Sequence, residues 1–235
     1  ANFDSESLAV TNVSSNSTGN SGSATQGVLG TYGTLTVAAD GTYTYTPNTA
    51  AAEALAEGAQ QTDVFTYTVK DDDDKNSSTA TLTITVTGKD DDPVASADTG
   101  TATEDGPQVS VDAASGVLAN DTDVDAGETL VVSAVGGNGA AVGQDVTGSL
   151  GTLNLDADGS YTYIADQAGA DAITAGQTAT DTFNYTLSDG EGTTSTVNLV
   201  ITVTGKGPEG VADTASVTEN ATVTNNNAAT NGVLA

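Results

Sequence analysis

Residues 33–48 read GTLTVAADGTYTYTPN, which places runs of alternating apolar and Thr residues on either side of an Asp-Gly pair. Alternation with a period of two is typical of a half-buried β-strand, whose successive side chains point to opposite faces. The pair Asp40-Gly41 supplies the positive φ that a tight hairpin turn requires, as does Asp158-Gly159 further along. The stretch predicts a β-hairpin, and both aspartates are predicted to be turn residues and not metal ligands.

The same alternation continues in TDVFTYTVKD at residues 62–71 and in TATLTITVTG at residues 79–88. Apolar residues share one face of each run and Thr the other, which is typical of strands packed on a core. The aromatic residues are predicted to lie in that core, with a carbohydrate-stacking platform as the alternative. They are Tyr43, Tyr45, Phe65, Tyr67, Tyr161, Tyr163, Phe183 and Tyr185.

An internal repeat indicates the architecture. Residues 30–71 align without gaps to residues 148–189, and nearly half of the aligned positions are identical. The opening ANFDSESLAV at 1–10 resembles a shortened form of 119–132, so the chain holds two periods cut out of phase. The other matched stretches are 78–90 with 194–206, 93–105 with 208–220, and GVLA at 116–119 with GVLA at 232–235.

Each period holds about seven short strands separated by turn signals, which predicts an all-β chain of tandem immunoglobulin- or cadherin-like Greek-key β-sandwiches. The Ala-rich stretches at 49–58 and 167–176 are predicted to be loops. The expected units are a first sandwich at 1–92 that lacks its opening strand, a complete second sandwich at 93–207 that carries this strand at 94–111, and the opening strand segment of a further repeat at 208–235.

The composition excludes most kinds of partner and catalyst. With 32 Asp and Glu against 4 Lys and Arg, the net charge is −28, which repels nucleic acid and anionic membranes and attracts cations. Cys, His, Met and Trp are absent, so the chain lacks a thiolate nucleophile, an imidazole base and soft-metal ligands. No apolar run is long enough for membrane insertion. We expect no enzyme activity, because nothing places two catalytic carboxylates in an apolar cleft.

The carboxylates cluster in predicted loops, which suggests that a hard metal ion replaces disulfides as a source of stability. Ca²⁺ takes about six to eight oxygen ligands, and loops can supply both carboxylates and backbone carbonyls. The alternatives are solvated charge and an acidic surface suited to solubility or high salt. The clustered acids are Asp71 to Asp74, Asp90 to Asp92, Glu104, Asp105, Asp121, Asp123, Asp125, Glu128, Asp189 and Glu191.

Three of these acids alternate along one loop. In an extended loop the side chains of Asp121, Asp123 and Asp125 project the same way and can converge on one ion. Asp71 matches Asp189 in the second copy, so both are candidate ligands. Asp72 to Asp74, beside a lysine, are instead predicted to form a solvated hairpin tip.

The ordered runs quoted above, followed by the linker DDPVA at 91–95, closely resemble the VCBS repeat, a cadherin-like module of giant bacterial surface adhesins of the RTX type. GVLANDTDVDAGETLVV at 116–132 resembles the start of such modules. The resemblance covers practically the whole chain. It implies a tandem extracellular array of β-sandwiches, often exported by a type I system, in adhesins that support surface attachment and biofilm.

By resemblance to cadherin-like junctions, linker acids, a Glu near the start of the following unit and an Asp-x-Asp loop are expected to share Ca²⁺ ions. The linker GKDDDPVA at 88–95 departs from the usual G-T-N-D-A-P-V-A by its Lys and extra Asp, and GKGPEGVA at 205–212 has lost its linker aspartates. The two junctions are therefore not expected to bind metal equally. The residues carried over are Asp90, Asp91, Asp92, Glu104, Asp121 and Asp123.

We therefore expect a structural extender segment of an extracellular adhesin or surface filament at the cell surface. Its expected partners are neighbouring repeats or head-to-tail copies of the same chain, and the alternative is a module that binds polysaccharide or a host surface. Segment 208–235 either belongs to one continuous tandem chain or is donated to the first unit of the next chain. In both cases it is expected to be ordered against a β-sandwich other than the one at 93–207.

Overall fold

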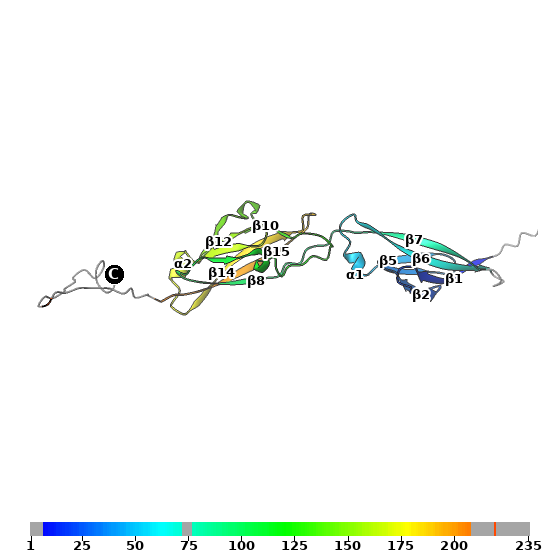
Figure 1. The fold of residues 1–235 in the computed structure, drawn as a ribbon, viewed down its shortest axis with the longest axis horizontal. Coiled ribbons are helices and arrows are strands. Elements are labelled where there is room, and N and C mark those ends of the chain that lie inside the picture. Colours follow the sequence, from blue (N-terminus) through cyan, green and yellow to red (C-terminus); the bar gives the residue numbers. More distant parts are fainter. Residues whose placement is uncertain (1–6, 72–76, 208–218, 220–235) are drawn as a thin grey trace, which may run out of the picture.

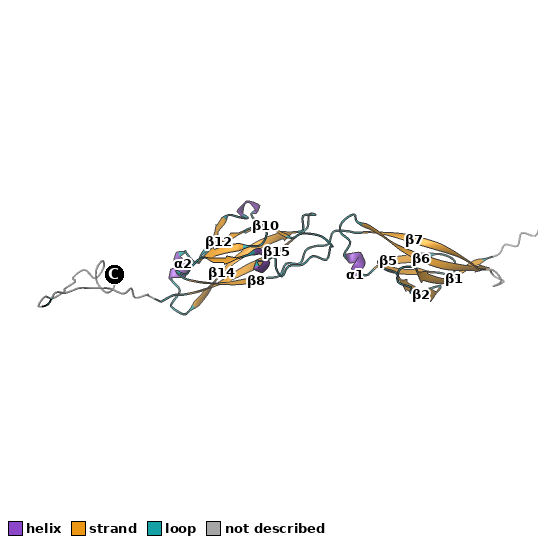
Figure 2. Cartoon of the chain, in the orientation of Figure 1, coloured by secondary structure: helices purple, strands orange, loops and turns teal. Residues whose placement is uncertain are grey.

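The computed structural model of the protein describes residues 7–71, 77–207 and 219. Two β-sandwich units follow one another along the long axis of the molecule (Figure 1). Strands form most of the regular structure, and the helices are short turns (Figure 2). The prediction of an all-β chain of tandem sandwiches is confirmed. Across the described residues, no helix is both long and apolar enough to cross a membrane.

The first unit is built from a four-stranded sheet of order β2-β1-β6-β7 and a three-stranded sheet of order β3-β4-β5. All neighbouring strands are antiparallel, and the predicted hairpin is the pair β4–β5, with Leu35 opposite Tyr45. The predicted solvated tip at Asp72 to Asp74 lies outside the described residues. The elements are β1 (Leu8–Ser15), β2 (Ser21–Ser23), β3 (Gly27–Leu29), β4 (Gly33–Val37), β5 (Tyr43–Pro47), α1 (Ala50–Glu53), β6 (Gln60–Asp71) and β7 (Ser77–Thr87).

The second unit has two four-stranded sheets, of order β10-β14-β15-β8 and β11-β12-β13-β9. Its strand pairs are antiparallel except for β15 and β8, which run parallel with Thr202 opposite Thr101. The elements are β8 (Asp98–Thr103), β9 (Val109–Val111), η1 (Ala113–Ser115), β10 (Val131–Val135), η2 (Gly139–Ala141), β11 (Asp145–Thr147), β12 (Thr152–Leu155), β13 (Tyr161–Ile164), α2 (Ala168–Asp171), β14 (Thr178–Ser188) and β15 (Thr194–Thr204).

The two units differ in their opening strands. β8 extends one sheet beyond β15, and β9 extends the other sheet beyond β13. No described strand of the first unit occupies either position, so the equivalent strands β7 and β5 lie at sheet edges. The segment 208–235, which repeats the sequence of β8, lies outside the described residues apart from Glu219.

The Ala-rich stretches are not plain loops, because each contains one helical turn. α1 begins after Thr49, whose hydroxyl accepts a hydrogen bond from the Ala52 N–H at 3.2 Å. α2 forms without a side-chain cap, and its Ala170 is fully buried. Burial of Ala170 in the core therefore outweighs the low helix propensity of the glycine in this segment. The prediction of a loop is wrong at these positions.

Each unit has its own apolar core. As predicted, Tyr163 and Tyr185 are fully buried in the second unit and Phe65 in the first. Tyr43 is 53 % exposed, although its equivalent Tyr161 is 6 % exposed. The prediction that Tyr43 lies in the core is wrong, because β8 and β9, which cover Tyr161, have no counterpart among the described strands of the first unit.

A buried carboxylate links the two sheets of the second unit. Asp181 on β14 is 2 % exposed. It accepts hydrogen bonds from the backbone N–H groups of Ser149, Leu150 and Gly151, each at 3.0 Å, and from the Tyr163 hydroxyl at 3.0 Å. These donors belong to β13 and to the turn before β12, in the opposite sheet, so one carboxylate holds both sheets in place.

The first unit repeats this arrangement around Asp63, which is fully buried. A glycine must precede the bound turn, because a Cβ on Gly30 would lie 2.2 Å from an Asp63 carboxylate oxygen. Gly148 is constrained in the same way by Asp181, at 2.4 Å. The donors to Asp63 are the N–H groups of Thr31 at 2.8 Å, Tyr32 at 3.0 Å and Gly33 at 3.2 Å, and the Tyr45 hydroxyl at 2.8 Å.

Asp181→Asn should lower the free energy of unfolding by about 3 kcal/mol, because an amide has one acceptor oxygen and leaves buried N–H groups without a partner. Burial acts to raise the pKa of Asp181, but the N–H bonds from Leu150 and Ser149 outweigh it and hold the pKa below its usual value. The stabilisation is therefore present at neutral pH and is lost as the pH falls through that lowered pKa.

Denaturant unfolding followed by circular dichroism measures this effect. The control is Asp145→Asn, since Asp145 is exposed and its replacement should change the free energy of unfolding by less than about 0.5 kcal/mol. Equal effects of the two substitutions would contradict the role assigned to Asp181.

Candidate metal centre at the junction of the units

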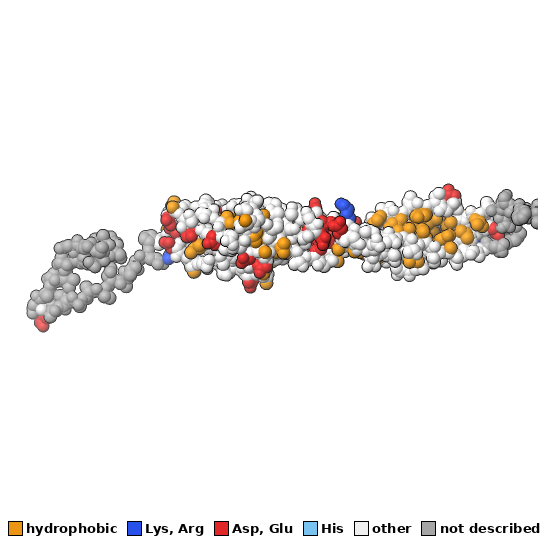
Figure 3. Space-filling view, turned by 90° about the horizontal axis from the view of Figure 1, so that it is seen from above, with side chains coloured by type: hydrophobic (Ala, Val, Ile, Leu, Met, Phe, Trp, Pro, Cys, Tyr) orange, Lys and Arg blue, Asp and Glu red, His pale blue; other side chains and the backbone are white. Residues whose placement is uncertain are grey.

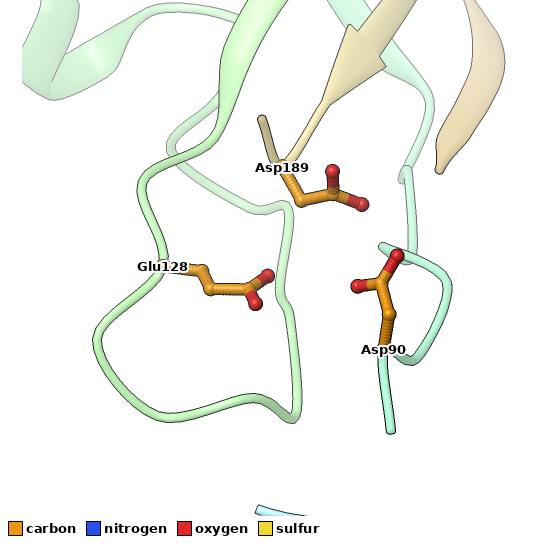
Figure 4. Close-up of side chains that lie close together, drawn as sticks. All are labelled: Asp90, Glu128 and Asp189. Atoms are coloured by element: carbon orange, nitrogen blue, oxygen red, sulfur yellow. The ribbon is translucent and has the colours of Figure 1, made fainter. Parts of the chain in front are cut away.

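Acidic side chains gather where the two units meet (Figure 3). Asp90 lies in the linker after β7, while Asp123, Asp125 and Glu128 lie in the loop before β10. Asp189 directly follows β14, and its side chain lies close to those of Asp90 and Glu128 (Figure 4). Asp90, Glu128 and Asp189 form one group, in which one carboxylate oxygen of each residue lies within 4.8 Å of those of the other two. Asp123, Asp125 and Glu128 form a second group by the same measure. Glu128 belongs to both groups and joins them.

Backbone hydrogen bonds hold the linker and the loop around this cluster. The Asp91 N–H donates to Asp125 Oδ2 at 2.9 Å, and the Asp125 N–H donates to Asp123 Oδ1 at 2.9 Å. Asp189 Oδ1 accepts a bond from the Glu191 N–H at 2.8 Å. One oxygen of each of these acids thus accepts a hydrogen bond from the backbone of the linker or loops. The second oxygen of Asp123 and of Asp125 does not take part in these bonds.

Five carboxylate oxygens of the cluster are buried and have no hydrogen-bond partner among the described residues. Burying an ionised group without a partner is costly, and neighbouring carboxylates also repel one another. A cation bound by these oxygens would remove both costs. The oxygens are Asp90 Oδ1, Asp123 Oδ2, Asp125 Oδ1, Glu128 Oε1 and Glu128 Oε2.

The donor set suits Ca²⁺. Hard cations prefer oxygen, and Ca²⁺ accepts about six to eight ligands in flexible geometry, whereas Mg²⁺ demands a near-octahedral shell and keeps several waters. The cluster offers carboxylates alone, and the chain has neither His nor Cys to favour a softer metal. These residues fit a calcium ion, with backbone carbonyls and water available to complete its shell.

The pKa values reflect the crowding. Burial, followed by the charges of Asp123, Asp125 and Asp90, raises the pKa of Glu128 to about 7. Burial and then the charge of Asp189 also raise the pKa of Asp90. Asp189 behaves differently, because hydrogen bonds from the Thr193 hydroxyl and three backbone N–H groups outweigh burial and lower its pKa. At neutral pH the cluster therefore holds charges that repel one another.

The structure brings together four of the residues that the sequence nominated: Asp90, Asp123, Asp125 and Asp189. Asp91 contributes through its backbone, donating to Asp125 and accepting a bond from the Thr193 hydroxyl at 3.4 Å. Asp92 is exposed and lies in neither group. Glu128 was placed in the acidic cluster by sequence but was not nominated as a ligand, although it lies in the same loop as Asp123 and Asp125.

Asp121 does not join the cluster. Its Oδ1 accepts a bond from the Ser96 N–H at 2.7 Å, and its Oδ2 lies 3.4 Å from the Tyr185 hydroxyl. That hydroxyl also donates to Asp98 at 2.7 Å, so Asp121 belongs to a buried network inside the second unit. Asp121, Asp123 and Asp125 are each less exposed than the residues between them, but the oxygens of Asp121 have partners inside the second unit, so the structure does not group Asp121 with the other two.

Glu104 and Asp71 lie at the outer ends of the units. β8 runs parallel to β15 with Thr103 opposite Thr204, so Glu104 emerges where β15 ends, and its Oε2 accepts a bond from the Lys206 N–H at 2.8 Å. Eleven residues of β15 separate that end from the junction, or about 35 Å. Sharing of an ion between Glu104 and the linker acids is therefore excluded by strand length. Asp71, the equivalent of Asp189, ends β6 at the opposite end of the first unit from Asp90.

The model of the bacterial cadherin-like domain family matches residues 1–88 and 90–205. The chain belongs to this family. The cadherin-like part of the resemblance seen in the sequence is thereby confirmed. No curated protein matches the chain significantly.

Solved structures of cadherin extracellular domains are similar to this bacterial cadherin-like chain at low identity. Protocadherin gamma B2 domains 3–6 are 13 % identical with a TM-score of 0.40, covering 85 % of this chain and 41 % of that one. Mouse cadherin-23 domains 22–24 are 15 % identical with a TM-score of 0.39, covering 73 % and 49 %. The chain thus spans less than half the length of these structures, and the family assignment depends on the family model alone.

Glu128→Gln should change how stability depends on pH in metal-free solution. Because folding raises the pKa of Glu128 from 4.5 to about 7, the folded protein loses stability as the pH rises from about 4.5 to about 7. Glutamine carries no charge, so the variant should lose less stability across this window. Thermal unfolding at pH 5 and pH 8 measures the difference.

The matched control is Glu53→Gln in α1, an exposed acid outside the cluster, which should keep the dependence of the unaltered protein. If Glu128→Gln and Glu53→Gln show the same dependence on pH, the carboxylates of the cluster do not repel one another as described.

Proposed function

We propose that this bacterial cadherin-like chain is a structural extender segment of an extracellular adhesin or surface filament, in which calcium binding at the junction stiffens the array. The observation that carries the proposal is the set of buried carboxylate oxygens without partners between the two units. In this proposal the chain binds calcium and separates its neighbouring units, and we assign it no catalytic step. We retain the VCBS type of adhesin array, with its role in surface attachment and biofilm, as part of the proposal.

The cluster is placed where it can control the angle between the units. Asp90 belongs to the linker, whereas Glu128 and Asp189 belong to the second unit. When bound, calcium supplies positive charge that neutralises these carboxylates. The linker acid is then held against the second unit, since moving it away would take one carboxylate ligand from the ion. Without neutralisation, repulsion between the same groups favours opening of the junction.

One backbone contact connects the acidic loop to the first unit directly. The Ala126 N–H donates to the carbonyl oxygen of Ala54, at the end of α1, at 3.3 Å. Ala126 lies between Asp125 and Glu128, so the geometry of the loop and the contact with the first unit change together. This contact supports a junction whose order depends on the acidic loop.

Direct binding of polysaccharide has little support in the described residues. Tyr43 is the one aromatic side chain among the large apolar residues that they expose. A single ring does not provide the aromatic strip on which a sugar chain would stack. We therefore favour the extender over the binding module.

Calcium should protect the linker from trypsin. The chain has 4 Lys and Arg residues, and one of them, Lys89, is exposed in the linker directly before Asp90. A protease needs a mobile strand of several residues, so calcium should slow cleavage after Lys89 by about tenfold or more. Limited proteolysis with mass spectrometry, in calcium and in chelator, measures this rate.

Two controls make the test specific. Cleavage after Lys206, which lies outside the cluster, should proceed at a rate that does not depend on calcium. Asp123→Asn combined with Glu128→Gln should abolish the protection at Lys89, while Glu53→Gln should preserve it. Equal cleavage at Lys89 with and without calcium would overturn the proposal.

A further inference from the structure

The first unit contains an apolar groove between two of its edge strands, β7 and β5, beside which no further described strand pairs. Its volume is about 310 Å³, and Leu35, Tyr43, Phe65, Tyr67 and Leu82 line it. In the second unit β8 and β9 lie beside the equivalent strands. The groove therefore lies where the second unit has β8, β9 and the core residues that these strands supply.

Matched residues show how much apolar surface the groove leaves uncovered. Leu199 and Ile201 on β15 are fully buried, whereas their equivalents Leu82 and Ile84 on β7 are partly exposed. Gly100 on β8 lies so close that an added Cβ would be 2.5 Å from Ile201 Cδ1 and 2.8 Å from the Tyr161 hydroxyl. A strand equivalent to β8 would bury the corresponding side chains of the first unit.

We propose that residues 208–235 of a second copy of the chain bind in this groove, with their first strand parallel to β7. The sequence PEGVADTASVTEN at 208–220 repeats PVASADTGTATED at 93–105, which contains β8. Ala215 and Val217 take the positions of Gly100 and Ala102, the inward residues of β8. Val217 is larger than Ala102 and fills more of the groove. Ala215 adds a Cβ where Gly100 has none, so the side-chain ends of Ile84 and Tyr43, the equivalents of Ile201 and Tyr161, must shift to admit it.

Two polar positions match as well. In the second unit the Tyr185 hydroxyl donates to Asp98 at 2.7 Å, and the segment carries Asp213 at the place of Asp98, opposite Tyr67. Glu104 accepts a bond from the Lys206 N–H, and the segment carries Glu219 at the place of Glu104, opposite Lys89. These two pairs specify the same register as the apolar positions.

Strand direction indicates a second copy as the donor. β7 runs toward the junction, so the chain that leads into a parallel strand must approach from the outer end of the first unit. Asp213 follows Gly207 by six residues, and Gly207 lies beyond the outer end of β15. Six residues span at most about 20 Å, which is less than the length of one unit. Because donor and acceptor surfaces differ, the contact is head-to-tail and extends into a filament.

Single-cysteine variants test the register directly, since the chain contains no Cys. Thr202 lies opposite Thr101 in the second unit, so Thr85 of one copy should lie opposite Ser216 of the next. Paired residues of neighbouring strands are about 5 Å apart, within reach of a disulfide. Thr85→Cys mixed with Ser216→Cys under mild oxidation should give a disulfide-linked heterodimer, identified by mass.

The matched control replaces Thr85→Cys by Thr79→Cys, six residues earlier on β7 and about 20 Å away, and should reduce the heterodimer at least about tenfold. Adding Val217→Asp to the donor should reduce it similarly, whereas Thr218→Asp, at the outward position of Thr103, should not. Measurements in chelator keep the test independent of the proposed metal site. Equal linkage at Thr79 and Thr85, no linkage at Thr85, or linkage insensitive to Val217→Asp would each overturn the proposal.

Discussion

The architecture of both units depends on one interaction, the hydrogen bonding of a buried aspartate to three successive backbone N–H groups of the opposite sheet. Asp63 and Asp181 each make it, with distances of 2.8 to 3.2 Å. The chain has no cysteine, and this carboxylate links the two sheets by hydrogen bonds, as a disulfide links them covalently in antibody domains. Its geometry also explains the glycine before each bound turn and the tyrosine that approaches from the neighbouring strand.

Buried carboxylates have a different environment at the junction of the units. Within each unit the aspartate is surrounded by donors, which stabilise its charge after it has left water. Between the units, Asp90, Asp125 and Glu128 are also withdrawn from water, but their orphaned oxygens face one another. The interior of each unit is therefore complete as a protein structure, whereas these oxygens at the junction have no hydrogen-bond partner among the described residues. In the proposed extender a cation supplies that partner, and the surroundings of the molecule then control its stiffness.

Much of the fold could be predicted from sequence because its signals are local. Alternation and the Asp-Gly turns depend on neighbouring residues, and the repeat shows the period directly. The position of Glu104 depends on how far β8 runs beside β15, which no local pattern states. The partners of Asp121, the Ser96 N–H and the Tyr185 hydroxyl, come from segments that are distant in the sequence. The role of Asp181 does have a local signal in the sequence. It occupies the same face of its strand as the buried Phe183 and Tyr185, at a position that the first unit repeats with Asp63.

The parallel pairing of β8 with β15 has a mechanical meaning. β8 opens the second unit and β15 closes it, so tension along the array pulls these two neighbouring strands in opposite directions. The force then acts along the strands, and the hydrogen bonds between them share the load instead of breaking one after another. A unit built in this way resists unfolding under tension, which suits the extender role that we propose.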